Sequence, residues 1–182
     1  LISPRSTSSV SMAGFPRRRL VQAMALPEVE GITPVHWNLL LWRNPKTRGT
    51  RSILALGFEP GDPLFVDPTL APKAQLLTQK GRVLFDEKSR PEFGPVAEWF
   101  RADRTVESEI SGQRVRVAGL IELGSSFGAD GNLLTSSETF LELLPNTPPG
   151  SIEVGLVRLQ EGTDPEAVVE KLNALLPEDV TV

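Results

Sequence analysis

The fold follows from the stretch LVQAMALPEVEGITPVHWNLLLW (residues 20–42). We expect a helix that begins with Pro16 in its first turn and that Pro27 ends, followed by a strand from Ile32 to Trp42. The same order returns near the other end of the chain. There, Thr163-x-x-Glu166 begins a helix, Leu176-Pro177-Glu178 ends it, and a strand begins at residues 180–182. Two strand–helix–strand units so far apart predict one split α+β domain with an inserted segment.

The boundaries of this split domain are set at residues 1–60 and 146–182, with the insertion at residues 61–145. The chain begins without Met, at Leu1-Ile2-Ser3, which is typical of the end of a strand. We therefore expect the chain to be a piece of a longer protein.

The hairpin before the insertion is predicted over residues 35–58, and its first strand is expected to be covered on both faces. The insertion itself contains short elements: a strand at 83–85, helical turns at 95–100, and a capping box at Thr135-x-x-Glu138 before a short helix.

The best local signal is a hairpin of residues 106–110 and 115–123, joined by Ser111-Gly112. This turn pairs Glu109 with Arg114 and Glu107 with Arg116 on one face, which leaves the apolar side chains on the other.

Composition excludes several classes of function. No run of 18 apolar residues exists, so no segment of this sequence is predicted to span a membrane. Cys is absent and His36 is the only histidine, so thiolate chemistry and a metal site are not expected. The net charge is -4, yet residues 1–51 hold eight basic side chains and two acidic ones. Such a dipolar chain can orient on a charged partner, but its acidic pI argues against nucleic acid.

The motifs that suggest chemistry are incomplete. Gly124-Ser125-Ser126-Phe127-Gly128 matches the G-x-S-x-G pattern of serine hydrolases, but no His follows Ser126. Asp130-Gly131-Asn132 lacks the further acidic ligands of a calcium loop. We therefore expect an interaction module with no catalytic residues, cofactor or metal, and a serine hydrolase stays a remote alternative.

A further set of stretches is spread over nearly the whole chain: LISPRSTS (1–8), FPRRRL (15–20), RSILALGF (51–58), LFD (84–86), SRPEFGP (89–95) and SFGADGN (126–132). This set resembles the DevC-type permease subunit of cyanobacterial ABC exporters, which belongs with the MacB-like permeases.

The resemblance implies a periplasmic domain of an inner-membrane permease, lying between its first and second transmembrane helices. It implies a Porter-type, ferredoxin-like subdomain built from both ends of the chain and an inserted, strand-rich Sabre-type subdomain. The implied partners are a periplasmic adaptor (membrane fusion protein), a separate cytoplasmic ATPase subunit, a second permease copy and, indirectly, a TolC-like outer-membrane channel. The implied function is to dock the adaptor and transmit ATP-driven motion in a glycolipid exporter.

Two places are candidates for partner binding. One is the loop of residues 124–132, with Phe127 and Asp130, and the other is the basic group Arg17, Arg18 and Arg19. The alternative function is direct binding of lipid or glycolipid in a cleft between the two subdomains, lined by residues such as Trp99 or Phe93.

Overall fold

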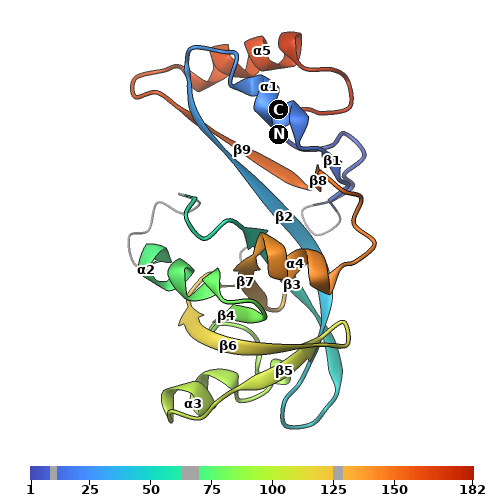
Figure 1. The fold of residues 1–182 in the computed structure, drawn as a ribbon, viewed down its shortest axis with the longest axis vertical. Coiled ribbons are helices and arrows are strands. Elements are labelled where there is room, and N and C mark those ends of the chain that lie inside the picture. The colour runs from blue at the N-terminus through green and yellow to red at the C-terminus, as the bar shows by residue number, and fades with distance from the viewer. Residues whose placement is uncertain (9–11, 63–69, 125–128) are drawn as a thin grey trace.

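The computed structural model describes residues 1–8, 12–62, 70–124 and 129–182 of the chain. It shows an elongated body of two lobes joined by one long strand, β2 (Figure 1). We call residues 1–35 and 150–182 the terminal lobe, and residues 36–149 the barrel lobe. The elements of the terminal lobe are β1 (Phe15–Pro16), α1 (Arg18–Ala23), the first half of β2 (Val29–Arg43), β8 (Ser151–Ile152), β9 (Val154–Leu159) and α5 (Pro165–Leu175).

The barrel lobe holds the second half of β2 and the remaining strands and helices. They are β3 (Thr50–Phe58), α2 (Leu70–Ala74), η1 (Gln75–Thr78), β4 (Arg82–Asp86), η2 (Pro91–Phe93), α3 (Val96–Arg101), β5 (Glu107–Ile110), β6 (Gln113–Ile121), β7 (Asn132–Ser136) and α4 (Ser137–Leu143). The mixed α+β class is as predicted.

Strand β2 changes its partner halfway along its length. Its first half pairs with β9, ending at Val35 opposite Val154. Its second half pairs with β3, beginning at His36 opposite Gly57. The border between the lobes therefore falls between two consecutive residues of one strand, without an intervening linker.

The sheet of the barrel lobe closes on itself. The strands follow the order β2–β3–β7–β4–β6–β5, and β5 returns to β2 where Ile110 pairs with Trp42. The pairs β3–β7 and β4–β6 are parallel and the others are antiparallel. Closure leaves this part of the sheet without a free hydrogen-bonding edge.

Three clusters of buried apolar side chains form the cores of the two lobes. One fills the barrel, where buried side chains such as Trp42, Val83 and Leu133 meet Phe93 and Phe140. A second lies outside the barrel under α2 and η1, and the third packs α1 and α5 onto the sheet of the terminal lobe. Each lobe thus has its own core.

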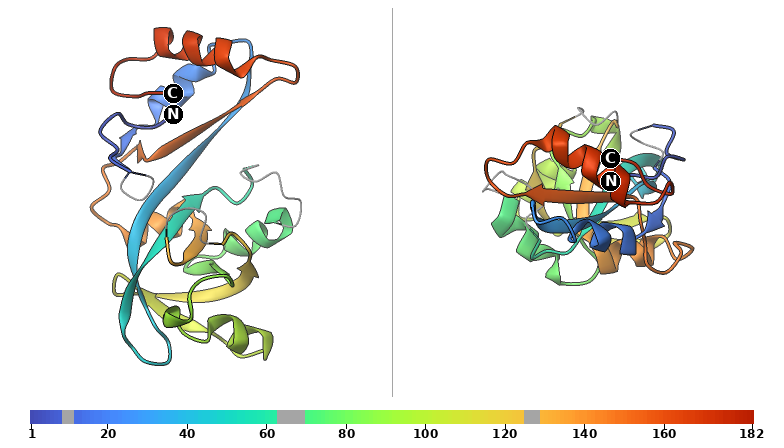
Figure 2. Two further views of the ribbon diagram at one scale, coloured as in Figure 1. Left: turned by 180° about the vertical axis from the view of Figure 1, so that it is seen from behind. Right: turned by 90° about the horizontal axis from the view of Figure 1, so that it is seen from above.

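The two ends of the described chain lie side by side. Ile2 and Thr181 exchange a pair of backbone hydrogen bonds, with N···O distances of 3.0 and 2.9 Å. Figures 1 and 2 show both ends in the terminal lobe, at the end of the body away from the barrel.

The hairpin of β5 and β6 has the predicted register, with Glu109 opposite Arg114 and Glu107 opposite Arg116. Its turn has positive φ at both Ser111 (49°) and Gly112 (85°). The predicted strand at 83–85 and the helical turns at 95–100 are also confirmed, as β4 and α3.

Three local predictions are wrong. Pro16 lies in β1, because it pairs with Ser151, and α1 begins at Arg18. The residues that cap α4 and α5 are Ser136 and Asp164, each one residue after the predicted cap. The second half of β2 is covered on one face only, since Leu39 and Leu41 are exposed. The strand predicted to begin at residues 180–182 is represented by a single β-bridge between Thr181 and Ile2.

Candidate partner-binding surfaces

The three arginines of the predicted basic group Arg17–Arg19 have different surroundings. Arg17 and Arg18 are exposed, whereas Arg19 is engaged by Asp179. The guanidinium of Arg19 donates from Nε to Oδ1 at 2.9 Å and from Nη2 to Oδ2 at 3.0 Å. This hydrogen bonding lowers the pKa of Asp179. Arg19 therefore ties α1 to the C-terminal segment and is not free for a partner.

Asp130 is also engaged within the chain. Its carboxylate forms ion pairs with Arg51 of β3 and with Arg90, in the segment after β4. The hydrogen bond from Arg51 is the main cause of a lowered pKa of Asp130. Phe127, the other candidate in this loop, lies outside the described residues. Asp130 and the arginines of α1 belong to different lobes, so the structure does not bring the predicted residues into one site.

A buried carboxylate that the sequence analysis missed stabilises the two ends of this loop. Asp86 is fully buried, and it accepts hydrogen bonds from the backbone N–H groups of Leu123 and Gly124 and from Nδ2 of Asn132 at 2.8 Å. A lone Asp at the end of a strand gives no signal of this role, because its donors come from residues far along the chain.

One cavity among the described residues lies between the two lobes and has a volume of about 470 Å³. Arg17 and Pro34 line it from the terminal lobe, while Glu59, Glu138 and Leu141 line it from the barrel lobe. The proline-containing segment of residues 144–152 forms a further wall. The cavity therefore offers apolar walls with one basic and two acidic groups.

The residues predicted to line a cleft between the lobes are elsewhere. Phe93 is fully buried in the barrel core, and its carbonyl accepts a hydrogen bond from Nε1 of Trp42 at 3.0 Å. Trp99 packs at the edge of the same core, and the guanidinium of Arg104 lies 4.2 Å from its ring centroid. That prediction was wrong because both side chains come from the segment after β4, which packs on the barrel.

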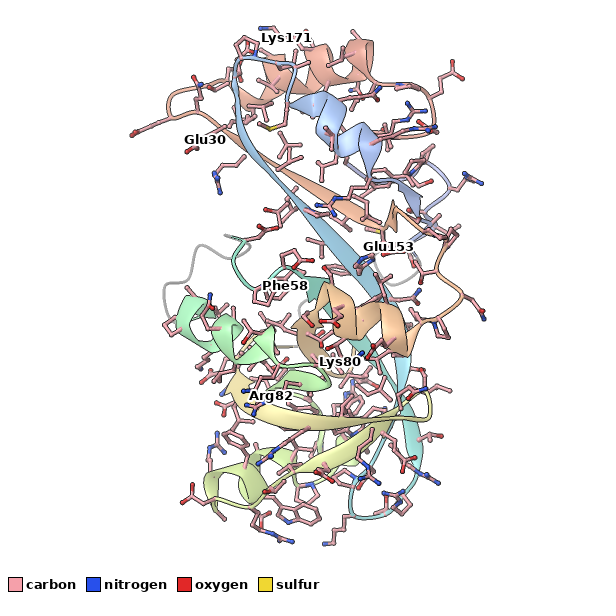
Figure 3. All side chains as sticks on the ribbon, in the orientation of Figure 1. Glu30, Phe58, Lys80, Arg82, Glu153 and Lys171 are labelled. Atoms are coloured by element: carbon pink, nitrogen blue, oxygen red, sulfur yellow. The ribbon has the colours of Figure 1, made fainter. Side chains whose placement is uncertain are left out.

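The only histidine of the sequence lies in the wall of the cavity and marks the border between the lobes. His36 is buried, its Nδ1 lies 3.1 Å from Oε2 of Glu153, and its ring stacks on Phe140 of α4 at 5.1 Å between centroids. Glu153, between β8 and β9, thus links the terminal lobe to β2 at the point where β2 enters the barrel lobe. Figure 3 shows Glu153 near this crossing of the lobes.

Neither a group of metal ligands nor a membrane-spanning helix is found in the described part of the structure. Among the residues that it describes, no group of three or more His, Cys, Asp or Glu side chains could hold a metal ion. Within the same residues, no helix has the length and apolar character that crossing a membrane requires. Ser126 lies outside the described residues, so the hydrolase alternative stays a prediction.

The chain is similar to known proteins in its fold, and not in its sequence. No family model matches the sequence. No curated protein sequence matches it either. A solved structure of the extracellular domain of the noncanonic ABC-type transporter YknZ from Gram-positive bacteria is similar, with 13% identity and a TM-score of 0.55. The likeness covers 93% of this chain and 89% of that one.

The periplasmic region of MacB from Actinobacillus actinomycetemcomitans is similar too, with 12% identity and a TM-score of 0.53. This likeness covers 88% of this chain and 74% of that one. The chain therefore has the fold of these extracytoplasmic domains over nearly all of its length.

Proposed function

We propose that the chain is the extracytoplasmic domain of an ABC transporter permease, which docks a periplasmic adaptor and passes ATP-driven motion to it. The observation that carries the proposal is the likeness in fold to two such domains, which extends over both lobes. On this proposal the domain belongs to an inner-membrane protein and faces the periplasm. It makes and breaks no bonds, since ATP is hydrolysed by a separate subunit.

The placement of the chain ends supports this proposal. Ile2 and Thr181 are held together by backbone hydrogen bonds in the terminal lobe. Two membrane helices attached at these ends would emerge from one side of the domain, and the barrel lobe would extend away from the bilayer (Figure 1). A movement of the helices would then displace the whole domain from one end.

The continuity of β2 supports the transmission of such a movement. Because a single strand belongs to both sheets, a force applied to the terminal lobe reaches the barrel through a hydrogen-bonded backbone. Motions of this kind are rigid-body displacements in many proteins.

The finer assignments are a DevC-type permease with Porter-type and Sabre-type parts, a second permease copy, a TolC-like channel beyond the adaptor, and glycolipid as cargo. They rest on the sequence resemblance.

The test uses the permease and its ATPase in lipid nanodiscs, with the adaptor encoded beside them. We expect the complex to retain the adaptor in a pull-down. Residues 1–182 contain no Cys, so after replacement of any Cys in the rest of the complex, spin labels at Lys46→Cys and Glu161→Cys report on the barrel lobe and the terminal lobe separately.

With ATP and vanadate, the distance between Lys46→Cys labels of two permease copies should change. The distance between labels at the two positions within one copy should stay constant. Failure to retain the adaptor would refute the docking function, and a constant distance between copies would refute the transmission of motion.

A second candidate is direct binding of a lipid or its headgroup, and the cavity between the lobes favours it. Its apolar walls and the guanidinium of Arg17 suit an acyl chain beside a polar group. Mass spectrometry of the purified protein should then show a bound lipid. Leu141→Trp, which fills the cavity, should lose that lipid, while Leu175→Trp on the outside of α5 should keep it.

A further inference from the structure

An unpaired basic strip lies on the outer face of the barrel. Arg116 of β6 is directly opposite Arg82 of the parallel strand β4. Neighbours in register point to the same side of a sheet, and adjacent strands are only about 4.8 Å apart. The inward side chains beside them, Val83 and Val117, fill the barrel core, so both arginines point outward. Figure 3 shows Arg82 on the barrel lobe, away from the chain ends.

Arg114 and Arg104 extend this strip. Arg114 lies two residues from Arg116 on β6 and therefore shares its face. Arg104 and Arg116 line the same pocket of about 200 Å³. The guanidinium of Arg104 is stacked on Trp99, which fixes its position beside the pocket. We call Arg82, Arg104, Arg114 and Arg116 the arginine strip.

The strip is not neutralised within the described residues. None of its members forms an ion pair there, although all five other arginines of the barrel lobe do. Glu109 is the cross-strand partner of Arg114, but its carboxylate oxygens are taken by Arg43 and Arg48. Glu107 is opposite Arg116 without an ion pair.

Two like charges directly opposite one another destabilise a sheet. The pair Arg82–Arg116 therefore works against the fold, and no ion pair within the described residues neutralises it, although Glu107 lies opposite Arg116 and Asp103 lines the pocket beside it. An anionic ligand would offset it, because adjacent guanidinium groups bind carboxylates through paired, charge-assisted hydrogen bonds.

We infer that the arginine strip is the docking surface for an acidic segment of the adaptor protein. This inference rests on the proposed function. A protein segment fits better than an anionic lipid surface, because the strip belongs to the lobe opposite the chain ends (Figure 1). The chain carries a net charge of -4, so a group of four arginines without an ion pair among the described residues is a place that can attract an acidic partner.

The test measures adaptor binding to the permease–ATPase complex by biolayer interferometry. The variant Arg82→Glu/Arg116→Glu should weaken binding by about tenfold or more and flatten its dependence on NaCl concentration. The matched control is Lys88→Glu/Lys171→Glu, which makes the same change of charge at exposed positions outside the strip and outside the basic residues 1–51. Its affinity should stay within about twofold of the wild type.

A fold check accompanies the test. The double substitution exchanges one like-charge pair for another and puts a carboxylate opposite Glu107, so the melting temperature should stay near or slightly below that of the wild type, and affinities are compared well below it. Equal loss of affinity in both variants would show general charge attraction and overturn the inference. Unchanged adaptor affinity, with loss of binding to phosphatidylglycerol vesicles, would overturn it in favour of a lipid surface. If the wild-type complex does not bind the adaptor at all, the proposed function fails first.

Discussion

Glu153 joins His36 at the point where β2 passes from one lobe to the other. The same carboxylate oxygen that lies 3.1 Å from Nδ1 of His36 also accepts a hydrogen bond from the backbone N–H of Trp37 at 3.2 Å. Both side chains are buried, with 7% and 8% of their surfaces exposed. A polar link is thus enclosed at the border of two apolar cores.

Removal of this link should destabilise the chain. Glu153→Leu leaves the ring nitrogen of His36 and the N–H of Trp37 without this acceptor. Unmet buried hydrogen-bonding groups cost about 1–3 kcal/mol. Urea unfolding should show this loss, whereas Glu178→Leu at an exposed position should leave the free energy of unfolding nearly unchanged. Equal stability of the two variants would contradict the structural role of Glu153.

Gly57 permits the close packing of β3 against α4. A Cβ atom at Gly57 would lie 2.6 Å from Cβ of Phe140, which is too close for two carbon atoms. We expect Gly57→Ala to displace α4 and to lower the free energy of unfolding by about 1–3 kcal/mol. Gly61→Ala is the control, because a Cβ there meets no atom within 4 Å. Chemical denaturation of both variants distinguishes crowding from a general effect of replacing glycine.

The ion pair of Arg19 and Asp179 should make stability depend on pH. Hydrogen bonding from Arg19 lowers the pKa of Asp179 in the folded state, so the folded chain holds this proton less readily than the unfolded chain. The stabilisation is therefore complete at neutral pH. It begins to fall near the ordinary aspartate pKa of about 3.9 and is lost as the pH drops through the folded-state value.

Accordingly, Asp179→Asn should be less stable than the wild type at pH 7, and the difference should shrink toward acidic pH. Thermal melts in a pH series measure this effect. A difference that stays constant over the series would show that the carboxylate charge contributes nothing. Glu161→Gln, at an exposed position, supplies the comparison.

Ser111 holds a positive φ of 49° in the turn between β5 and β6. This conformation is unfavourable for residues with a side chain, and glycine adopts it freely. Ser111→Gly should therefore stabilise the chain by about 1 kcal/mol, after the greater flexibility of glycine in the unfolded state is included. Differential scanning calorimetry should show a higher melting temperature, and a decrease would mean that the hydroxyl of Ser111 has a role of its own.

The hairpin of β5 and β6 could be predicted because its signals are local. Turn residues, charge pairs and alternating apolar residues all favour one register over a few neighbouring positions. Closure of the barrel could not be predicted in this way, because the parallel pairs β3–β7 and β4–β6 join strands that are not adjacent in sequence. The strip around Arg82 and Arg116 depends on one of these pairs, so no local pattern indicated it.

Local signals failed where a distant segment competes for the same residue. Pro16 suits the first turn of a helix, but it pairs with Ser151 instead. Arg19 belongs to a basic run, but Asp179 engages it from the far end of the chain. The capping residues Ser136 and Asp164 each follow a threonine that could also cap the helix. Sequence alone therefore locates those helix starts only to within one residue.

The shared strand also limits how this protein can be divided. Since β2 supplies hydrogen bonds to β9 with one half and to β3 with the other, a cut anywhere in β2 except between Val35 and His36 leaves part of a sheet unpaired. A chimera that exchanges residues 61–145 would separate β3 from β7, its parallel neighbour. Recombination between related proteins would preserve the architecture more readily with crossovers inside β2 and after α4, so that a barrel is inherited whole.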